Sequence, residues 1–152
     1  METIEKSVEI LNDLIQINND REIGFGKAAK ELDSSNADLQ AIFLNCALES
    51  RRFVKELRDE AGRLEAQPEN DTSNLGAIHR AWMEVKAAFS GHDRRSVLEE
   101  CERGEDAIKK AYLDALSPKN DLSAEIIPVL LRQQQKINES HDQIKALRDS
   151  SK

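Results

Sequence analysis

The sequence has little of what builds β-sheets, flexible linkers or membrane spans. Its 152 residues include one tryptophan, one tyrosine, four phenylalanines, six glycines and three prolines. The content of aromatic and β-branched residues is low for a β-sandwich or barrel. The prolines stand apart, which excludes a proline-rich linker, and the apolar runs are far shorter than the roughly 20 residues of a membrane-spanning helix. These absences predict a single all-α domain over residues 1–152 with no membrane association.

Basic clusters and cysteine motifs are also missing. The formal net charge is −7, and an acidic chain repels phosphate backbones, so no nucleic-acid partner is expected. Cys46 and Cys101 are the two cysteines and lack the C-x-x-C spacing, which predicts two buried thiols in a reducing compartment. The first ten residues lack the basic and apolar regions of a signal peptide. We therefore expect a cytoplasmic protein.

What the sequence has is helical periodicity. Apolar residues recur every three or four positions through most of the chain, which indicates amphipathic helices. The pattern predicts four long helices, at residues 4–32, 37–66, 94–116 and 123–148, and a short one at residues 75–89. Helices of such similar length favour a ferritin-like four-helix bundle, in which the short helix lies in the crossover between the second and third long helices. The rival topology is a plain up-down-up-down bundle.

Polar residues interrupt the predicted inner stripes near the middle of each long helix. In the first helix the stripe reads Val8, Leu11, Ile15, Asn18, Glu22, Phe25, Ala29 and Leu32. The corresponding interruptions in the other three helices are Glu49, Glu105 and Gln134. Counted from the turns, all four residues fall at nearly the same level. Buried carboxylates need a compensating charge, shared protons or water, so the sequence predicts a polar layer at mid-bundle.

One interpretation of this layer is a metal site. Ferritin-like di-metal proteins use a glutamate from each of two helices and Glu-x-x-His from each of the other two. Here the candidate ligands are Glu22, Glu49, Glu105 and His141, with iron or manganese as the candidate cofactor. The pattern is incomplete, since Arg52 stands where the histidine after Glu49 would be.

The other interpretation is a structural ion-pair network that fixes the register of the helices. The Arg52 guanidinium lies one helical turn from Glu49 and could neutralise the carboxylates, with help from Arg21 or Arg103. Glu102, one turn from Glu105, is a further candidate ligand if a metal does bind. Both interpretations stay open at this point.

Three stretches resemble a known family. They are residues 11–25 of the first helix, His79-Arg80-Ala81-Trp82-Met83 in the short helix, and the run from Leu98 through Glu102-Arg103-Gly104-Glu105-Asp106 to Tyr112. Together they are similar to a bacterial domain-of-unknown-function family described as ferritin-like four-helix-bundle proteins. The resemblance implies a bacterial, cytosolic, ferritin-like bundle and supplies no activity. By it, the positions to single out are His79, Arg80, Trp82, Glu102, Arg103, Glu105 and Asp106.

Two functions follow from these observations. No phosphate-binding loop, dinucleotide fingerprint or nucleophile motif is present, which favours a non-enzymatic protein that acts through self-association or a protein partner, in a stress-related role. The apolar residues off the main stripes would supply its contact surface; they are Leu14, Ile17, Leu44, Leu48 and Val54. The alternative is a ferritin-like metal-binding or redox protein with an atypical carboxylate site at mid-bundle.

Overall fold

The described part of the chain is helical. The computed structural model describes residues 2–32, 34–64 and 94–151, which contain no strand. Its elements are α1 (Glu2–Glu31), the short 3-10 helix η1 (Ser34–Asn36), α2 (Ala37–Arg63), α4 (Arg94–Ala115) and α5 (Ile127–Ser150). The all-α prediction and the four long helices are therefore confirmed, with ends within four residues of those expected. The predicted short helix at residues 75–89, with His79, Arg80 and Trp82, lies outside the described residues.

Local chemistry explains where the helices begin and end. The side-chain amide of Asn120 donates to the backbone oxygens of Asp114 and Ala115, at 2.8 and 3.1 Å, and so satisfies carbonyls that the end of α4 leaves open. Pro128 stands in the first turn of α5, where its missing N–H costs no helical hydrogen bond. The start of α5 is therefore set by this proline, four residues after the predicted one.

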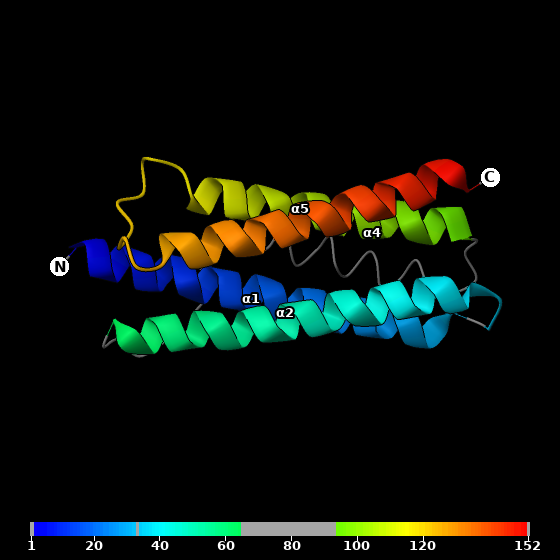
Figure 1. The fold of residues 1–152 in the computed structure, drawn as a ribbon, viewed down its shortest axis with the longest axis horizontal. Helices are drawn as coiled ribbons and strands as arrows, with labels where there is room; N and C mark the ends of the chain where they lie inside the picture. The colour runs from blue at the N-terminus through cyan, green and yellow to red at the C-terminus, as the bar shows by residue number, and fades with distance from the viewer. Residues whose placement is uncertain (1, 33, 65–93, 152) are drawn as a thin grey trace.

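The helices pack as two antiparallel pairs, α1 with α2 and α4 with α5, and the pairs lie side by side (Figure 1). The starts of α2 and α4 lie at the same end, where Arg94 Nη2 is 2.6 Å from Asp38 Oδ2. At the other end, Thr3 Oγ1 donates to Asp121 Oδ2 at 2.6 Å. Since α2 and α4 run in the same direction, α2 ends and α4 begins at opposite ends of the bundle.

The apolar core forms two clusters with a polar layer between them. One cluster contains Leu11, Leu57 and Ile108, and the other contains Phe25, Phe43 and Leu98. Along α1, α2 and α4, the residues between the clusters include buried polar ones: Asn18, Arg21, Ser50 and Glu105. The predicted mid-bundle polar layer is therefore present, although its members differ in part from those expected.

The burial of α1 corrects one detail of the predicted stripe. Arg21 is fully buried, whereas Glu22 is only half-buried. Leu14 and Ile17, which the sequence placed off the stripe, lie in the core with Val54, while Leu44 and Leu48 are exposed. The buried face of α1 is thus wider than a single heptad seam, because α1 contacts both α2 and α4. None of the described helices is apolar enough over a sufficient length to cross a membrane.

Candidate functional site

Arg21 of α1 is the centre of the polar layer. Its Nε donates to Glu105 Oε1 at 2.7 Å and its Nη2 to Glu105 Oε2 at 3.1 Å, a bidentate pair across α1 and α4. Nη2 also lies 3.1 Å from Glu49 Oε1 of α2. Nη1 donates to Ser50 Oγ at 2.8 Å and to the Cys46 carbonyl oxygen at 3.3 Å. One guanidinium therefore ties three helices together.

Burial and charge act against each other in this layer. Burial on its own would lower the pKa of Arg21, but the Glu105 carboxylate, helped by Glu49, outweighs it and raises the pKa above its ordinary value. Arg21 is therefore charged at any ordinary pH. For Glu49 the balance is reversed, because burial raises the pKa above its ordinary value of 4.5 despite the neighbouring guanidinium. The carboxyl group of Glu49 is therefore easier to protonate than an exposed glutamate.

A chain of hydrogen bonds continues the layer towards α5. Ser50 Oγ donates to Asn18 Oδ1 at 2.8 Å, and Asn18 Nδ2 donates to the Tyr112 hydroxyl at 2.8 Å. The Tyr112 hydroxyl in turn donates to Gln133 Oε1 at 2.7 Å, and Gln133 Nε2 donates to Glu56 Oε1 at 3.0 Å. Burial raises the pKa of Tyr112, so this phenol stays protonated and acts as both acceptor and donor. All four long helices contribute to the network.

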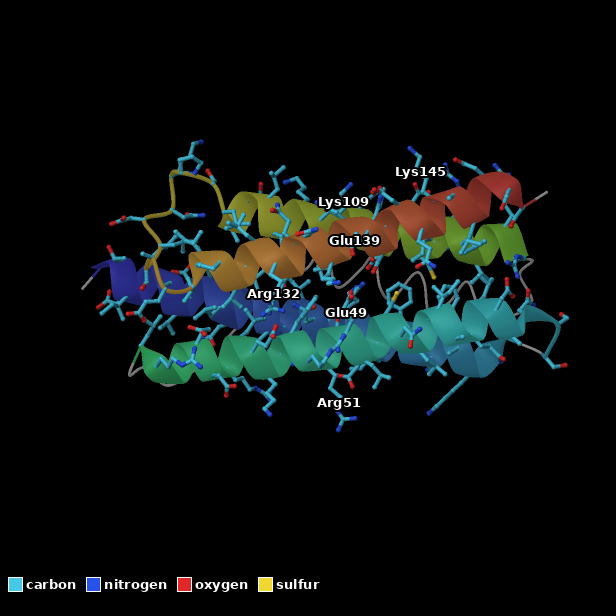
Figure 2. The ribbon with its side chains drawn as sticks, viewed as in Figure 1. Glu49, Arg51, Lys109, Arg132, Glu139 and Lys145 are labelled. Atoms are coloured by element: carbon cyan, nitrogen blue, oxygen red, sulfur yellow. The ribbon has the colours of Figure 1, made fainter. Side chains whose placement is uncertain are left out.

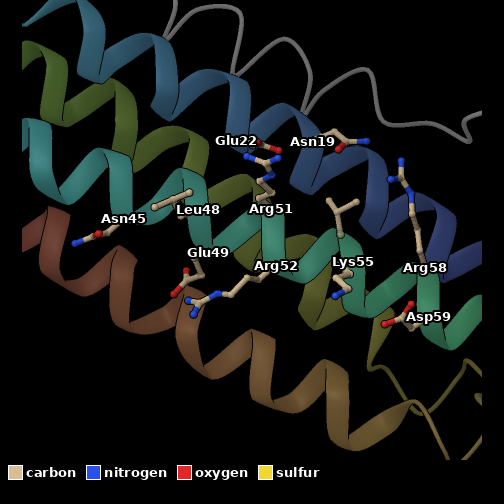
Figure 3. Close-up of a pocket in the computed structure, with 11 residues that line it drawn as sticks. Asn19, Glu22, Asn45, Leu48, Glu49, Arg51, Arg52, Lys55, Arg58 and Asp59 are labelled. Atoms are coloured by element: carbon tan, nitrogen blue, oxygen red, sulfur yellow. The ribbon is translucent and has the colours of Figure 1, made fainter.

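Of the predicted mid-bundle residues, Glu49 and Glu105 meet at Arg21. The expectation that Glu22 joins them is not met, since Glu22 is half-buried and lines a surface hollow on the α1 side of α2 (Figure 3). Gln134 is also half-buried, and its neighbour Gln133 is the residue inside. Arg52 is exposed. Arg21, and not Arg52, therefore supplies the compensating charge.

The mid-bundle layer does not fit a metal ion. Both oxygens of Glu105 accept hydrogen bonds from Arg21, and Glu49 Oε1 faces the same guanidinium. Glu49 points from α2 toward α5 (Figure 2), where Ser140 Oγ donates to it at 3.4 Å. A cation bound here would have to share the carboxylates with a buried positive charge. The geometry therefore agrees with the ion-pair interpretation.

A second polar cluster lies between α4 and α5. His141 Nε2 is 2.6 Å from Asp106 Oδ1 and 3.9 Å from Glu102 Oε1. Arg148 Nη1 donates to Glu102 Oε2. Arg103 is outside this group; it is exposed and pairs with Glu100 at 2.9 Å. Glu102, Asp106 and His141, which the sequence analysis had singled out for separate reasons, are thus brought together, seven residues along α5 from the level of Gln134.

Both cysteines are buried and free, as predicted. Burial raises the pKa of the Cys46 thiol to about 12 and also raises the pKa of Cys101. Thiols with raised pKa values are poor nucleophiles and poor metal ligands, since both roles need the thiolate. The cysteines are therefore parts of the apolar core.

The comparison with protein families agrees with the resemblance seen in the sequence. The model described as "Domain of unknown function (DUF2383)" matches residues 6–118, which is most of the chain. The chain belongs to this family. A search of curated proteins found no match. The family assigns no activity, so the function has to be argued from the two polar clusters and from the surface.

Ser50, Glu56 and Gln133 are the network members that the sequence analysis missed. Glu56 lies beside the stripe residue Leu57, Ser50 is adjacent to Glu49, and Gln133 is adjacent to Gln134. For Ser50 and Gln133, two neighbouring polar residues fit the helical spacing about equally well. The sequence holds no signal that decides between them, because the choice depends on which residue finds a partner on the facing helix.

Proposed function

We propose that this protein is a non-catalytic, ferritin-like four-helix-bundle protein of the bacterial cytoplasm that works by associating with a second copy of itself. The ferritin-like topology is supported by the parallel directions of α2 and α4 (Figure 1), which a long crossover between them requires. A reducing compartment is supported by the two free, buried cysteines.

The main support for a non-catalytic protein is that Arg21 occupies the carboxylates of the mid-bundle layer. In ferritin-like di-metal proteins the metal-binding residues lie at this level of the bundle. Here the fully buried guanidinium is bonded to Glu105, Ser50 and the backbone of Cys46. The charges and hydrogen-bonding groups of this layer therefore pair with one another inside the protein, as expected for a structural role. The alternative of an iron or manganese site at this level has less support for the same reason.

The proposed contact surface is the outer face of α2. Leu44 and Leu48, one turn apart, are 49% and 56% exposed. Beside Leu48 lies a hollow of about 960 Å³, lined by the cations Arg51, Arg52, Lys55 and Arg58 and by the carboxylates of Glu22, Glu49 and Asp59 (Figure 3). Exposed leucines next to a group of cations are typical of an interaction surface. Because Glu22 and Asp59 line the same hollow as these cations, the carboxylates of one copy can pair with the cations of the other across a symmetric contact.

Light scattering on the purified protein at micromolar concentrations tests the proposal. We expect a dimer, and we expect Leu48→Glu to shift it to monomer. Leu113→Glu, which places the same charge on an equally exposed leucine of α4, is the matched control and leaves the dimer intact. A monomeric wild-type mass contradicts self-association. Dissociation by the Leu113 variant in place of the Leu48 variant contradicts the α2 surface.

The stress-related role remains a prediction that growth of a deletion strain can test. We expect normal growth in rich medium and a defect under at least one of acid, peroxide or osmotic stress. Equal growth of the deletion and parent strains under all three conditions would contradict that role, without bearing on self-association.

A further inference from the structure

We propose that Glu102, Asp106 and His141 bind one divalent first-row transition metal ion between α4 and α5. This site is distinct from the mid-bundle layer and does not depend on self-association. Glu102 and Asp106 are four residues apart in α4, so they project from the same face of the helix, and His141 reaches them from α5. One ligand atom from each of the three residues lies within 4.8 Å of the other two.

The state of the histidine points to a missing ligand. His141 is 7% exposed, yet its buried Nε2 atom makes no hydrogen bond. Asp106 Oδ1 is only 2.6 Å from Nε2, so this oxygen lies off the direction in which Nε2 would donate a proton. Buried polar atoms in native proteins are normally satisfied. A cation bound to Nε2 and to the carboxylate oxygens would satisfy all of them.

The surroundings of the three residues suit ligation. His141 Nδ1 is 3.3 Å from Asp142 Oδ1. When Nδ1 donates its proton to that carboxylate, the Nε2 lone pair is directed at the candidate site, which is the usual arrangement of metal-binding histidines. Arg148 Nη1 donates to Glu102 Oε2. This bond leaves Glu102 Oε1 as the oxygen nearer His141.

The charge around the site also favours a cation. The two carboxylates carry two negative charges, and Arg148 compensates for one of them through Glu102. Lys145 of α5 points outward from the bundle (Figure 2). In contrast to the mid-bundle layer, where Arg21 contacts both carboxylates, Arg148 contacts Glu102 at the oxygen farther from His141. The Asp106 carboxylate faces the Nε2 atom directly.

The distances require only a small adjustment. Metal–oxygen and metal–nitrogen bonds of about 2.0–2.2 Å place two ligands of one ion at most about 4.4 Å apart. The Asp106 side chain is 61% exposed, so it can rotate with little effect on packing. An imidazole with two carboxylates suits Mn²⁺, Fe²⁺ or Zn²⁺ better than Mg²⁺ or Ca²⁺, which prefer oxygen ligands alone.

Calorimetric titration of the chelator-treated, full-length protein with Zn²⁺ tests the proposal. We expect one Zn²⁺ per chain, and we expect Asp106→Asn and His141→Gln to weaken binding by at least about tenfold. Because Asp106 is exposed, Asp106→Asn keeps the fold even if the histidine variant does not. The controls are Glu49→Gln, at mid-bundle, and His92→Gln, which removes a histidine that is not part of the proposed site and lies outside the described residues. Both are expected to bind as the wild type does.

Titration with Co²⁺ adds a spectroscopic readout. Its visible absorption bands report the ligands of the ion, and we expect the bands to change in His141→Gln and to persist in His92→Gln. Absence of binding by the wild type would overturn the proposal. So would full binding by both Asp106→Asn and His141→Gln, or loss of binding in the Glu49 or His92 controls.

Discussion

The two polar clusters of the bundle contain similar residues but differ in how their bonding capacity is used. Each has two carboxyl groups that face a nitrogen side chain, Arg21 in the first cluster and His141 in the second, at an interface between long helices. At mid-bundle, Arg21 directs hydrogen bonds to Glu105, Ser50 and the Cys46 carbonyl oxygen. Between α4 and α5, the buried Nε2 atom of His141 makes no hydrogen bond. The first cluster is complete within the protein, and the second is not.

Whether the polar atoms already have hydrogen-bond partners therefore distinguishes a structural cluster from a binding site better than the residue types do. Sequence patterns single out any carboxylate on an inner stripe as a candidate metal ligand. By that criterion Glu105 is a better candidate than the carboxylates of the second cluster. Once the partners are known the order reverses, because both oxygens of Glu105 are occupied by Arg21. A binding site needs a polar atom that makes no hydrogen bond within the protein, and of the two clusters only that of Glu102, Asp106 and His141 has such an atom, the Nε2 of His141.

The largest effect is expected from Arg21→Met, which breaks the complete cluster. Without the guanidinium, Glu105 is left buried and charged, and removing one partner of a buried ion pair typically costs about 3–5 kcal/mol. We expect a loss of this size in the free energy of unfolding, measured by urea denaturation at neutral pH.

A double variant provides the control for this loss. Arg21→Met combined with Glu105→Leu removes both charges, and we expect it to recover most of the stability, because well-packed apolar replacements of buried ion pairs are often neutral. A single Arg21→Met variant with wild-type stability would contradict the account of this cluster.

The next effect is the stabilisation of the protein by Zn²⁺ through the incomplete cluster. A ligand that binds only the folded state at 100 times its dissociation constant adds about 2.7 kcal/mol to the free energy of unfolding. We expect this gain in the wild type and in Glu49→Gln, and at most about 1.4 kcal/mol in Asp106→Asn, whose binding is at least about tenfold weaker. Thermal unfolding with and without Zn²⁺ measures it, and an equal gain in all three proteins would place the ion elsewhere.

Tyr112→Phe extends the comparison to the hydrogen-bond chain of the complete cluster. It removes the hydroxyl that donates to Gln133 Oε1 and accepts from Asn18 Nδ2. Asn18 Nδ2 keeps a second acceptor, the Leu14 carbonyl oxygen at 2.9 Å. Only the Oε1 atom of Gln133 loses its partner outright, so we expect a cost of about 1–2 kcal/mol. Urea denaturation measures this cost, and unchanged stability would show that the chain is not coupled to folding.

The smallest effect at neutral pH is expected from Glu49→Gln. Because burial raises the pKa of Glu49 above 4.5, the folded state binds this proton more tightly than the unfolded state does. Its contribution to stability is therefore present below pH 4.5 and is lost as the pH rises through the raised pKa. We expect the variant to lack this loss, measured by urea denaturation between pH 4 and 7. Identical pH profiles for variant and wild type would contradict the raised pKa.

Most of the fold could be predicted from the sequence, and the polar layer only in part. The sequence placed Glu105 on the inner stripe of α4, and it is fully buried, as are Leu98 and Tyr112, which lie seven residues before and after it. In α1, by contrast, Asn18 and Phe25 are seven residues apart, and either Arg21 or Glu22 fits between them with steps of three and four. The sequence interpretation chose Glu22. Arg21 is the buried residue because carboxylates on the facing helices pair with it. The residue pattern of α1 alone does not show those partners.

The same ambiguity explains Gln133 and Gln134, which lie between Leu130 and Ile137. The incomplete cluster could not be assembled from the sequence for a different reason. Its members come from two helices, and Asp106 and His141 are 35 residues apart in the sequence. Pairing them requires the relative register of α4 and α5. Helix period and composition do not determine that register.

Anomalous diffraction from crystals grown with Zn²⁺ tests the contrast between the two clusters most directly. The account predicts one strong peak within bonding distance of Glu102, Asp106 and His141, and no peak at mid-bundle, where Arg21 keeps its bidentate contact with Glu105. A peak between Glu49 and Glu105 with Arg21 displaced, and none at His141, would contradict it.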